Sequence, residues 1–126
     1  MISEEFAYDE IRLNSNSFSI KKYKDGIYRG EVHRKSLKRH GKGVMVYDSG
    51  RIYEGLWKHD KRQDHGFELY ASGNTYQGHY FDGKADGKGI YCWANGESYQ
   101  GQFSRGRKHG HGIWKGINGD SYLGAW

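Results

Sequence analysis

The sequence predicts an all-β protein, a single-layer twisted antiparallel meander of β-hairpins that is either elongated or curled into a half-pipe. Three observations lead to this fold class. Tyrosine, glycine and a second aromatic residue recur together at a fixed period, their spacing matches one face of a strand, and turn signals separate the strands. The 126 residues include 20 glycines and no proline, so glycine is used at defined positions rather than in a flexible linker.

The repeat is visible from four tyrosines that fall 23 residues apart. Each is followed by a glycine two residues later and an aromatic residue two residues after that. The triplets are Tyr53, Gly55 and Trp57; Tyr76, Gly78 and Tyr80; Tyr99, Gly101 and Phe103; and Tyr122, Gly124 and Trp126. Other glycines keep the same period, with one departure at Asp64 in the series of Gly41, Gly87 and Gly110. Such a period is typical of a repeat array whose units bury their apolar faces on one another.

Each unit reads as two strands. Residues at i, i+2 and i+4 share one face of a strand, because side chains alternate in direction. A helix would need apolar residues at i, i+3 and i+4, and its glycines would oppose it by up to about 1 kcal/mol each. The second strand of each unit begins with glycine and an apolar residue, at Val44, Phe67, Ile90 and Ile113.

Turn residues lie between these strands. Asn95-Gly96 and Asn118-Gly119 predict two-residue hairpin turns in which both central residues have positive φ. Glycine within a strand needs another explanation, because it costs entropy there and often marks the close approach of another group. At Gly55 we expect the missing Cβ to let an aromatic ring from the adjacent strand lie flat over the backbone, so that the rings form one ladder.

The unit boundaries follow from the tyrosines. Repeat units are predicted to start at Tyr28, Tyr53, Tyr76, Tyr99 and Tyr122 within residues 28–126, with the last unit incomplete. Residues 20–27 read as a degraded half repeat, and residues 1–19 as an N-terminal arm or cap in which Ile2, Phe6 and Leu13 could cover the first hairpin. The strand that ends at Trp126 would form an open edge, which we expect further repeats or another chain to cover.

The order Tyr-x-Gly-x-aromatic, a turn, Gly-x-Gly, a short apolar run and a final glycine resembles the MORN (membrane occupation and recognition nexus) repeat over about residues 28–126. The resemblance implies a non-catalytic module. Members of that family occur in proteins that tether two membranes, in ciliary and cytoskeletal proteins, and before lipid kinase or lysine methyltransferase domains. It therefore suggests a cytoplasmic protein of the cytoskeleton or cilium, or one at the cytosolic face of a membrane.

Two groups of residues are candidates for binding. The aromatic face is predicted to bind a protein partner through Tyr53, Trp57, Tyr76, Tyr80, Tyr99, Phe103, Tyr122 and Trp126. Basic residues recur in the turns and would form a discontinuous rim along one edge, at Lys38, Arg39, Lys58, Lys61, Arg62, Arg105, Arg107 and Lys108. That rim is either a solvated edge that prevents unwanted strand pairing or a contact for acidic protein or anionic lipid.

Other chemistry is disfavoured. The segment "GKADGKG" lacks the spacing and the Lys-Ser/Thr of a phosphate loop, and its glycines recur in every unit. His109 and His111 share a strand face but no third metal ligand is evident nearby, and the carboxylates are scattered through turns. No catalytic residue, metal or cofactor is predicted. Nucleic acid is disfavoured too, because the aromatic residues are periodic for structural reasons.

Composition limits the remaining options. The formal net charge is +5, and Cys92 is the single cysteine, which excludes an internal disulfide. No segment of the sequence has the length and apolarity of a membrane-spanning helix. The leading hypothesis is a non-enzymatic scaffold that binds a partner segment. The alternatives are a membrane-surface module for anionic phospholipids and the N-terminal targeting module of a larger enzyme.

Overall fold

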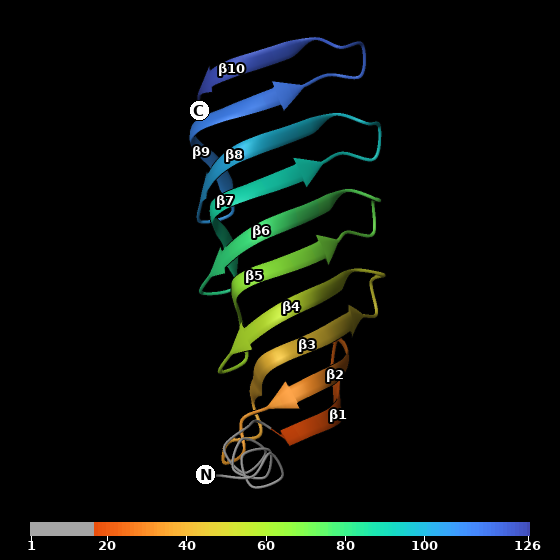
Figure 1. Cartoon of the computed structure of the whole chain (residues 1–126). Coiled ribbons are helices and arrows are strands. Elements are labelled where there is room, and N and C mark those ends of the chain that lie inside the picture. Colours follow the sequence, from red (N-terminus) through yellow and green to blue (C-terminus); the bar gives the residue numbers. More distant parts are fainter. Residues whose placement is uncertain (1–16) are drawn as a thin grey trace, which may run out of the picture.

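A computed structural model describes residues 17–126, which form one sheet of ten antiparallel strands in sequence order (Figure 1). The strands are β1 (Ser17–Tyr23), β2 (Gly26–Val32), β3 (Arg39–Tyr47), β4 (Ile52–Lys58), β5 (Lys61–Leu69), β6 (Thr75–Phe81), β7 (Lys84–Cys92), β8 (Ser98–Ser104), β9 (Arg107–Lys115) and β10 (Ser121–Ala125). They stack into an elongated body with β1 at one end and β10 at the other (Figure 1). The predicted fold class, an open antiparallel meander of hairpins, is confirmed.

The pairing register separates the two faces of the sheet. Tyr53 on β4 lies opposite Glu68 on β5, whereas Glu54 lies opposite Phe67. We call the first side the ring face, because it carries the repeat tyrosines Tyr28, Tyr53, Tyr76 and Tyr99. We call the other side the open face, and it carries Glu54, Phe67, Gln77, Ile90, Gln100 and Ile113.

Each of the four repeat units that start at Tyr28, Tyr53, Tyr76 and Tyr99 contains a β-bulge after the glycine of its first strand. Between β4 and β5 the register shifts between Gly55 and Trp57, which leaves Leu56 without a partner on β5. The hydroxyl of Tyr53 donates a hydrogen bond of 2.8 Å to the carbonyl oxygen of Leu56. The same bond runs from Tyr28 to Glu31 at 2.5 Å, from Tyr76 to His79 at 2.8 Å and from Tyr99 to Gln102 at 2.9 Å.

The aromatic ladder expected from the sequence is present and continuous. Neighbouring rings meet edge to face, with centroids 4.8 to 5.5 Å apart. Their order along the sheet is Tyr28, Trp57, Tyr53, Tyr80, Tyr76, Phe103, Tyr99, Trp126 and Tyr122. This geometry is favourable because the positive edge of one ring meets the negative face of the next. The ladder thus supplies the buried core that a second layer would supply in a sandwich.

Glycine allows these rings to reach the backbone. A Cβ atom on Gly66 would lie 2.4 Å from the hydroxyl of Tyr53, and one on Gly89 would lie 2.4 Å from that of Tyr76. Each ring therefore covers a glycine of the adjacent strand, as expected. At Gly55 itself the expectation is wrong in detail, because a Cβ there would meet the backbone of β5, 2.6 Å from the Cα atom of Gly66, and the hydroxyl of Tyr53 on its own strand.

The prediction for the turns at Asn95-Gly96 and Asn118-Gly119 is wrong. Positive φ occurs there only at the glycines, with values of 99° and 84°. The amide of Gly96 donates to the carbonyl of Trp93, whose own amide donates to Glu97, as in a three-residue loop that ends in a bulge glycine. Two-residue turns with positive φ at both central residues lie at the opposite edge, at His59-Asp60, Asp82-Gly83 and Arg105-Gly106.

The departure at Asp64 keeps the backbone of the repeat. Its φ is 60°, and the glycines at the same position of the other units have φ of 92° at Gly41, 93° at Gly87 and 60° at Gly110. Aspartate is among the few residues with a side chain that enter the left-handed region readily. The substitution therefore leaves the bulge intact.

The predicted N-terminal arm lies mostly outside the described residues, and its expected capping residues Ile2, Phe6 and Leu13 are among those not described. Ser17–Ser19, which the sequence assigned to the arm, belong to β1. Residues 20–27 contain the tight turn between β1 and β2, where Tyr23 pairs with Gly26.

Candidate interaction site

Most of the aromatic residues predicted to bind a partner are buried by the ladder. The buried members are Tyr53, Trp57, Tyr76, Tyr80, Tyr99 and Phe103. Tyr122 and Trp126, at the end of the ladder, are 52% and 40% exposed. The six buried rings contact one another and the backbone, so in this arrangement they offer a partner little surface. That these rings bind a partner stays a prediction.

One position of the ring face carries a buried carboxylate. Glu68 is 1% exposed and occupies the place held by Met45, Tyr91 and Trp114 in the other units. It accepts hydrogen bonds from Arg51, from Arg62 at 3.1 Å and from the Tyr80 hydroxyl at 2.6 Å. Because a buried charge is costly without such partners, these contacts join side chains of three consecutive units rather than form an open site.

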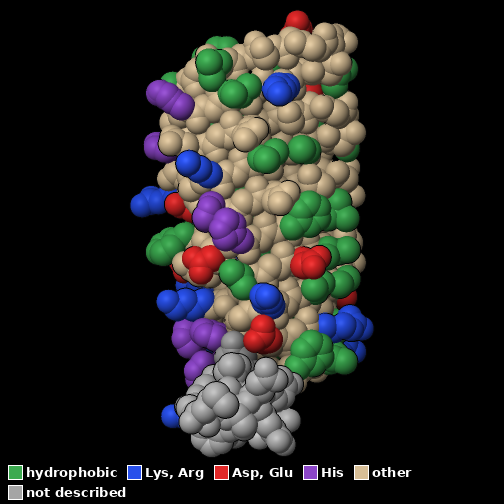
Figure 2. Space-filling model, in the orientation of Figure 1, with side chains coloured by type: hydrophobic (Ala, Val, Ile, Leu, Met, Phe, Trp, Pro, Cys, Tyr) green, Lys and Arg blue, Asp and Glu red, His purple; other side chains and the backbone are tan. Residues whose placement is uncertain are grey.

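The open face carries a concave feature that described residues line. It is an unroofed furrow of about 1040 Å³ that crosses β4 to β10, and the glycines of the strands form its floor. Phe67, Ile90 and Ile113 line it, one from each of three consecutive units, and they are 38 to 40% exposed. In Figure 2 the histidine side chains gather toward the left of the molecule, and backbone and other side chains, drawn in tan, occupy most of the middle.

Polar and basic groups line the rest of the furrow. His65 and His79 stack with ring centroids 4.1 Å apart, and Lys88 and His111 continue the furrow lining. Glu54 is the one carboxylate among the furrow residues. The furrow therefore combines an apolar row with imidazole and ammonium groups, which suits a partner segment with apolar and acidic side chains.

Sequence reasoning did not propose this furrow. It identified Val44, Phe67, Ile90 and Ile113 as the apolar residues of the second strands, but assigned binding to the aromatic face. The sequence did contain one indication of the furrow. These apolar residues alternate with the aromatic positions and so lie on the other face, where a single-layer sheet has no second layer to cover them.

The predicted basic rim divides into paired and exposed residues. Arg39 contacts Asp60 at 3.1 Å, Lys61 contacts Asp82 at 2.5 Å, Arg62 contacts Glu68, and Lys108 lies over the ring of Trp93. Burial opposes ionisation of Asp60, but the hydrogen bonds from Arg39 outweigh it and lower the pKa of that carboxyl. Lys61 is exposed although it is paired, and the other exposed members are Lys38, Lys58, Arg105 and Arg107. They lie in or directly beside connections at one edge of the sheet. Lys38 and Arg105 are in the connections between β2 and β3 and between β8 and β9, Lys58 ends β4, and Arg107 begins β9.

Within residues 17–126, no group of three or more His, Cys, Asp or Glu side chains has the geometry to hold a metal ion. His109 and His111 lie on β9. The same part of the chain contains no helix with the length and apolarity to cross a bilayer.

Comparison with known families agrees with the geometry. The MORN repeat matches residues 38–50, 53–75, 76–98 and 99–121, four consecutive repeats that cover well over half of the chain. The chain belongs to the MORN repeat family. This family is a non-catalytic repeat module that commonly mediates contacts with proteins or membrane lipids. A comparison with curated proteins finds no match.

Proposed function

We propose that this chain is a non-enzymatic scaffold module that binds an extended or helical segment of a partner protein in the furrow of its open face. The observation that carries this proposal is the row of Phe67, Ile90 and Ile113. Exposed apolar residues that recur in line along a surface are typical of interaction sites, and no second layer covers them in the described residues.

The spacing of this row sets a requirement on the partner. Successive members lie two strands apart, which corresponds to about 9.6 Å at ordinary strand separations. A helix meets this spacing with one apolar residue about every seven positions, and an extended chain meets it with one about every three. The buried ladder on the other face keeps the row rigid, so the partner does not have to order the sheet when it binds.

The proposed setting is a cytoplasmic cytoskeletal or ciliary assembly, because related repeats occur in such assemblies. In this role the module performs no chemistry and positions one protein on another. Its specificity comes from the three apolar contacts and the basic groups beside them.

The test is capture of a partner from ciliated cells by cross-linking and mass spectrometry. A triple variant, Phe67→Gln, Ile90→Gln and Ile113→Gln, should lose a partner that the wild-type chain retains at high salt. Phe81→Gln with Ile117→Gln is the matched control, because both residues are exposed and lie outside the furrow lining. Retention of the same partner by the furrow triple variant would refute the proposal. Loss on Tyr122→Ser with Trp126→Ser would instead support the aromatic face.

A further inference from the structure

The charge of the chain is distributed unevenly along its sequence. Residues 17–43, which form β1, β2 and part of β3, contain nine Lys and Arg against two Asp and Glu. Residues 44–126 contain ten against nine, and residues 1–16 contain one against four. The first hairpins are therefore strongly basic, and the segment directly before them in the sequence is acidic.

The open face of these hairpins carries a second hollow, of about 450 Å³, which extends from β1 to β4. Phe18, Val44 and Leu56 form its apolar lining. Phe18 is 71% exposed, and Ile20, the next residue on the same face of β1, is 65% exposed. No second layer covers this surface in the part of the chain that the structure describes, so an apolar side chain placed here would remove it from water.

Two cations border this hollow. Arg29 lies opposite Ile20 on β1 and opposite Val44 on β3, so its side chain is on the open face, and Lys42 lies two residues before Val44. Both line the hollow, as does Glu54 on β4. Among residues 17–126, no carboxylate forms an ion pair with Arg29 or Lys42.

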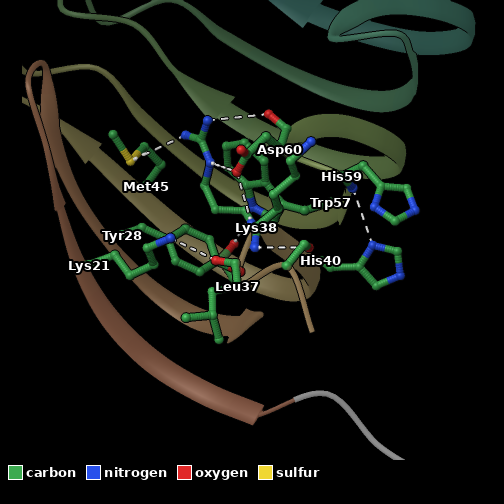
Figure 3. A network of polar contacts seen from close by, with 12 residues as sticks. Lys21, Tyr28, Leu37, Lys38, His40, Met45, Trp57, His59 and Asp60 are labelled. Atoms are coloured by element: carbon green, nitrogen blue, oxygen red, sulfur yellow. Dashed lines mark hydrogen bonds and ion pairs between the residues drawn. The ribbon is translucent and has the colours of Figure 1, made fainter. Parts of the chain in front are cut away.

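Neighbouring cations on the side of the ring face are engaged within the sheet. Figure 3 shows the ammonium group of Lys21, from β1, donating to the carbonyl oxygen of Leu37 at 2.7 Å. Arg39 contacts Asp60 at 3.1 Å. Of the basic residues of the first hairpins, those beside the hollow are therefore better placed to receive further carboxylates.

Residues 1–16 have the composition that this hollow requires. Phe6 lies between two pairs of carboxylates, Glu4 with Glu5 and Asp9 with Glu10. The 16 residues span up to about 50 Å when extended, whereas β1 and β4 are about 14 Å apart at ordinary strand separations. The segment directly precedes β1, whose Phe18 lines the hollow, so the covalent link keeps its effective concentration at the hollow high.

We propose that residues 1–16 dock in this hollow of their own chain, with Phe6 against Phe18 and Leu56 and with the carboxylates of the segment beside Arg29 and Lys42. Burial of the ring and several exposed charge pairs act together in this contact. The segment thus covers the open face of the first hairpins, as the aromatic ladder covers the ring face.

The docked segment also affects the furrow. The hollow shares Glu54 and Gly55 with the furrow lining, so the segment would end the furrow at β4 and set how far a partner segment extends. This consequence rests on the proposed function, whereas the docking itself does not. Docking can therefore fail its test while the proposed function stands, and the reverse is also true.

Modification of a thiol in the full chain measures the docking without a partner protein. In a Cys92→Ser background, Val44→Cys places a thiol in the hollow. Ile90→Cys is the matched control, because position 90 is the equivalent position two units later and lies in the furrow. When docking is lost, a maleimide should react with the thiol at position 44 about tenfold faster and with the thiol at position 90 at an unchanged rate.

Two sets of changes in the segment remove the docking by different routes. Glu4→Gln with Glu5→Gln, Asp9→Asn and Glu10→Gln removes the charge pairs, and Phe6→Ser removes the apolar contact without changing the charge. Each should accelerate the reaction at position 44 by about tenfold. Unchanged rates at position 44 in both variants, or equal acceleration at positions 44 and 90, would overturn the proposal. Protection that increases with protein concentration would also overturn it, because the segment would then come from a second copy of the chain.

Discussion

The hydroxyl of Tyr53 donates a hydrogen bond to the carbonyl oxygen of Leu56, the residue that the β-bulge leaves without a partner on β5. One side chain thus satisfies a carbonyl of the bulge three residues away, and its ring covers Gly66 of the next strand. The recurrence of this contact in three other units explains why the repeat requires tyrosine at this position, whereas the next ladder position accepts Trp57, Tyr80 or Phe103.

The first prediction tests this hydrogen bond. Tyr76→Phe keeps the ring but removes the donor to the carbonyl of His79. The variant should lower the free energy of unfolding by about 1 to 2 kcal/mol, because a polar group loses its partner next to a buried ring. Urea denaturation measures the loss. Tyr122→Phe, at the exposed end of the ladder, is the control and should change stability by less than about 0.5 kcal/mol. Equal losses would show that the bond contributes nothing beyond the ring.

The second prediction concerns the glycines of the strands. A Cβ atom on Gly78 would lie 2.5 Å from both the Cα atom of Gly89 and the carbonyl oxygen of Lys88, which are backbone atoms that cannot move aside. Gly78→Val should therefore destabilise the sheet by about 3 kcal/mol or more. Gln77→Val, one residue away on the open face, should stay within about 0.5 kcal/mol of wild type. Thermal denaturation compares the two variants, and equal melting temperatures would refute this explanation of the strand glycines.

Much of the fold could be predicted from the sequence because the same pattern of tyrosine, glycine and aromatic residues recurs in several units. The 23-residue period gives the strand boundaries, and the alternation of Tyr53, Gly55 and Trp57 places their side chains on one face. The turn types were less accessible. Asn95-Gly96 has the composition of a two-residue turn, yet the loop contains a third residue, and the two-residue turns include His59-Asp60, which has no glycine. We infer that the register of the paired strands determines the turn types more than the local composition of each loop does.

The candidate site was harder to predict, because periodicity alone does not say which face of a single sheet is covered. The aromatic residues of the repeat have the chemistry of an interaction surface, but the edge-to-face contacts bury them. The smaller side chains of Phe67, Ile90 and Ile113 remain accessible because they have no such neighbours on the open face. The sequence alone does not show whether an aromatic residue is buried or accessible, because this depends on how its ring packs against neighbouring rings in the structure.

The third prediction tests the buried carboxylate. Glu68→Ala leaves Arg62 and the hydroxyl of Tyr80 without their partner, and should cost about 3 to 5 kcal/mol, as for other broken buried ion pairs. Glu54→Ala, on the open face, is the control and should be near neutral. The double variant Glu68→Tyr with Arg62→Ala reproduces the next unit, which has Tyr91 and Ala85 at these places, and should recover most of the loss. A double variant no more stable than Glu68→Ala would show that the residues of the next unit cannot replace the hydrogen-bond network of Glu68.

The fourth prediction concerns acid. Burial, then the neighbouring rings of His59 and His33, lowers the pKa of His40, with Lys58 acting in the same direction and Glu31 against it. A lowered pKa means that folding favours the neutral imidazole. Its contribution to stability is present above the unfolded-state pKa of about 6.5 and decreases as the pH falls below that value.

The measurement is the urea midpoint at pH 7.5 and at pH 5.5. In His40→Asn, the side-chain oxygen can still accept the amide of His59, which in wild type donates to Nδ1 of His40 at 3.2 Å. The decrease in the midpoint between the two pH values should therefore be smaller in this variant than in wild type. An unchanged decrease would mean that other groups cause the acid sensitivity.

The last prediction concerns alkali. Burial raises the pKa of Tyr53, Tyr76 and Tyr80 well above 10 and that of Tyr70 to about 12. The folded state therefore holds these protons after the unfolded chain would have lost them. Their contribution to stability is present below about pH 10 and decreases as the pH rises above it. Ultraviolet absorbance of tyrosinate and the far-ultraviolet circular dichroism of the sheet should therefore change together in a steep transition. Ionisation of most tyrosines near pH 10 while the sheet remains folded would show that the ladder does not exclude water.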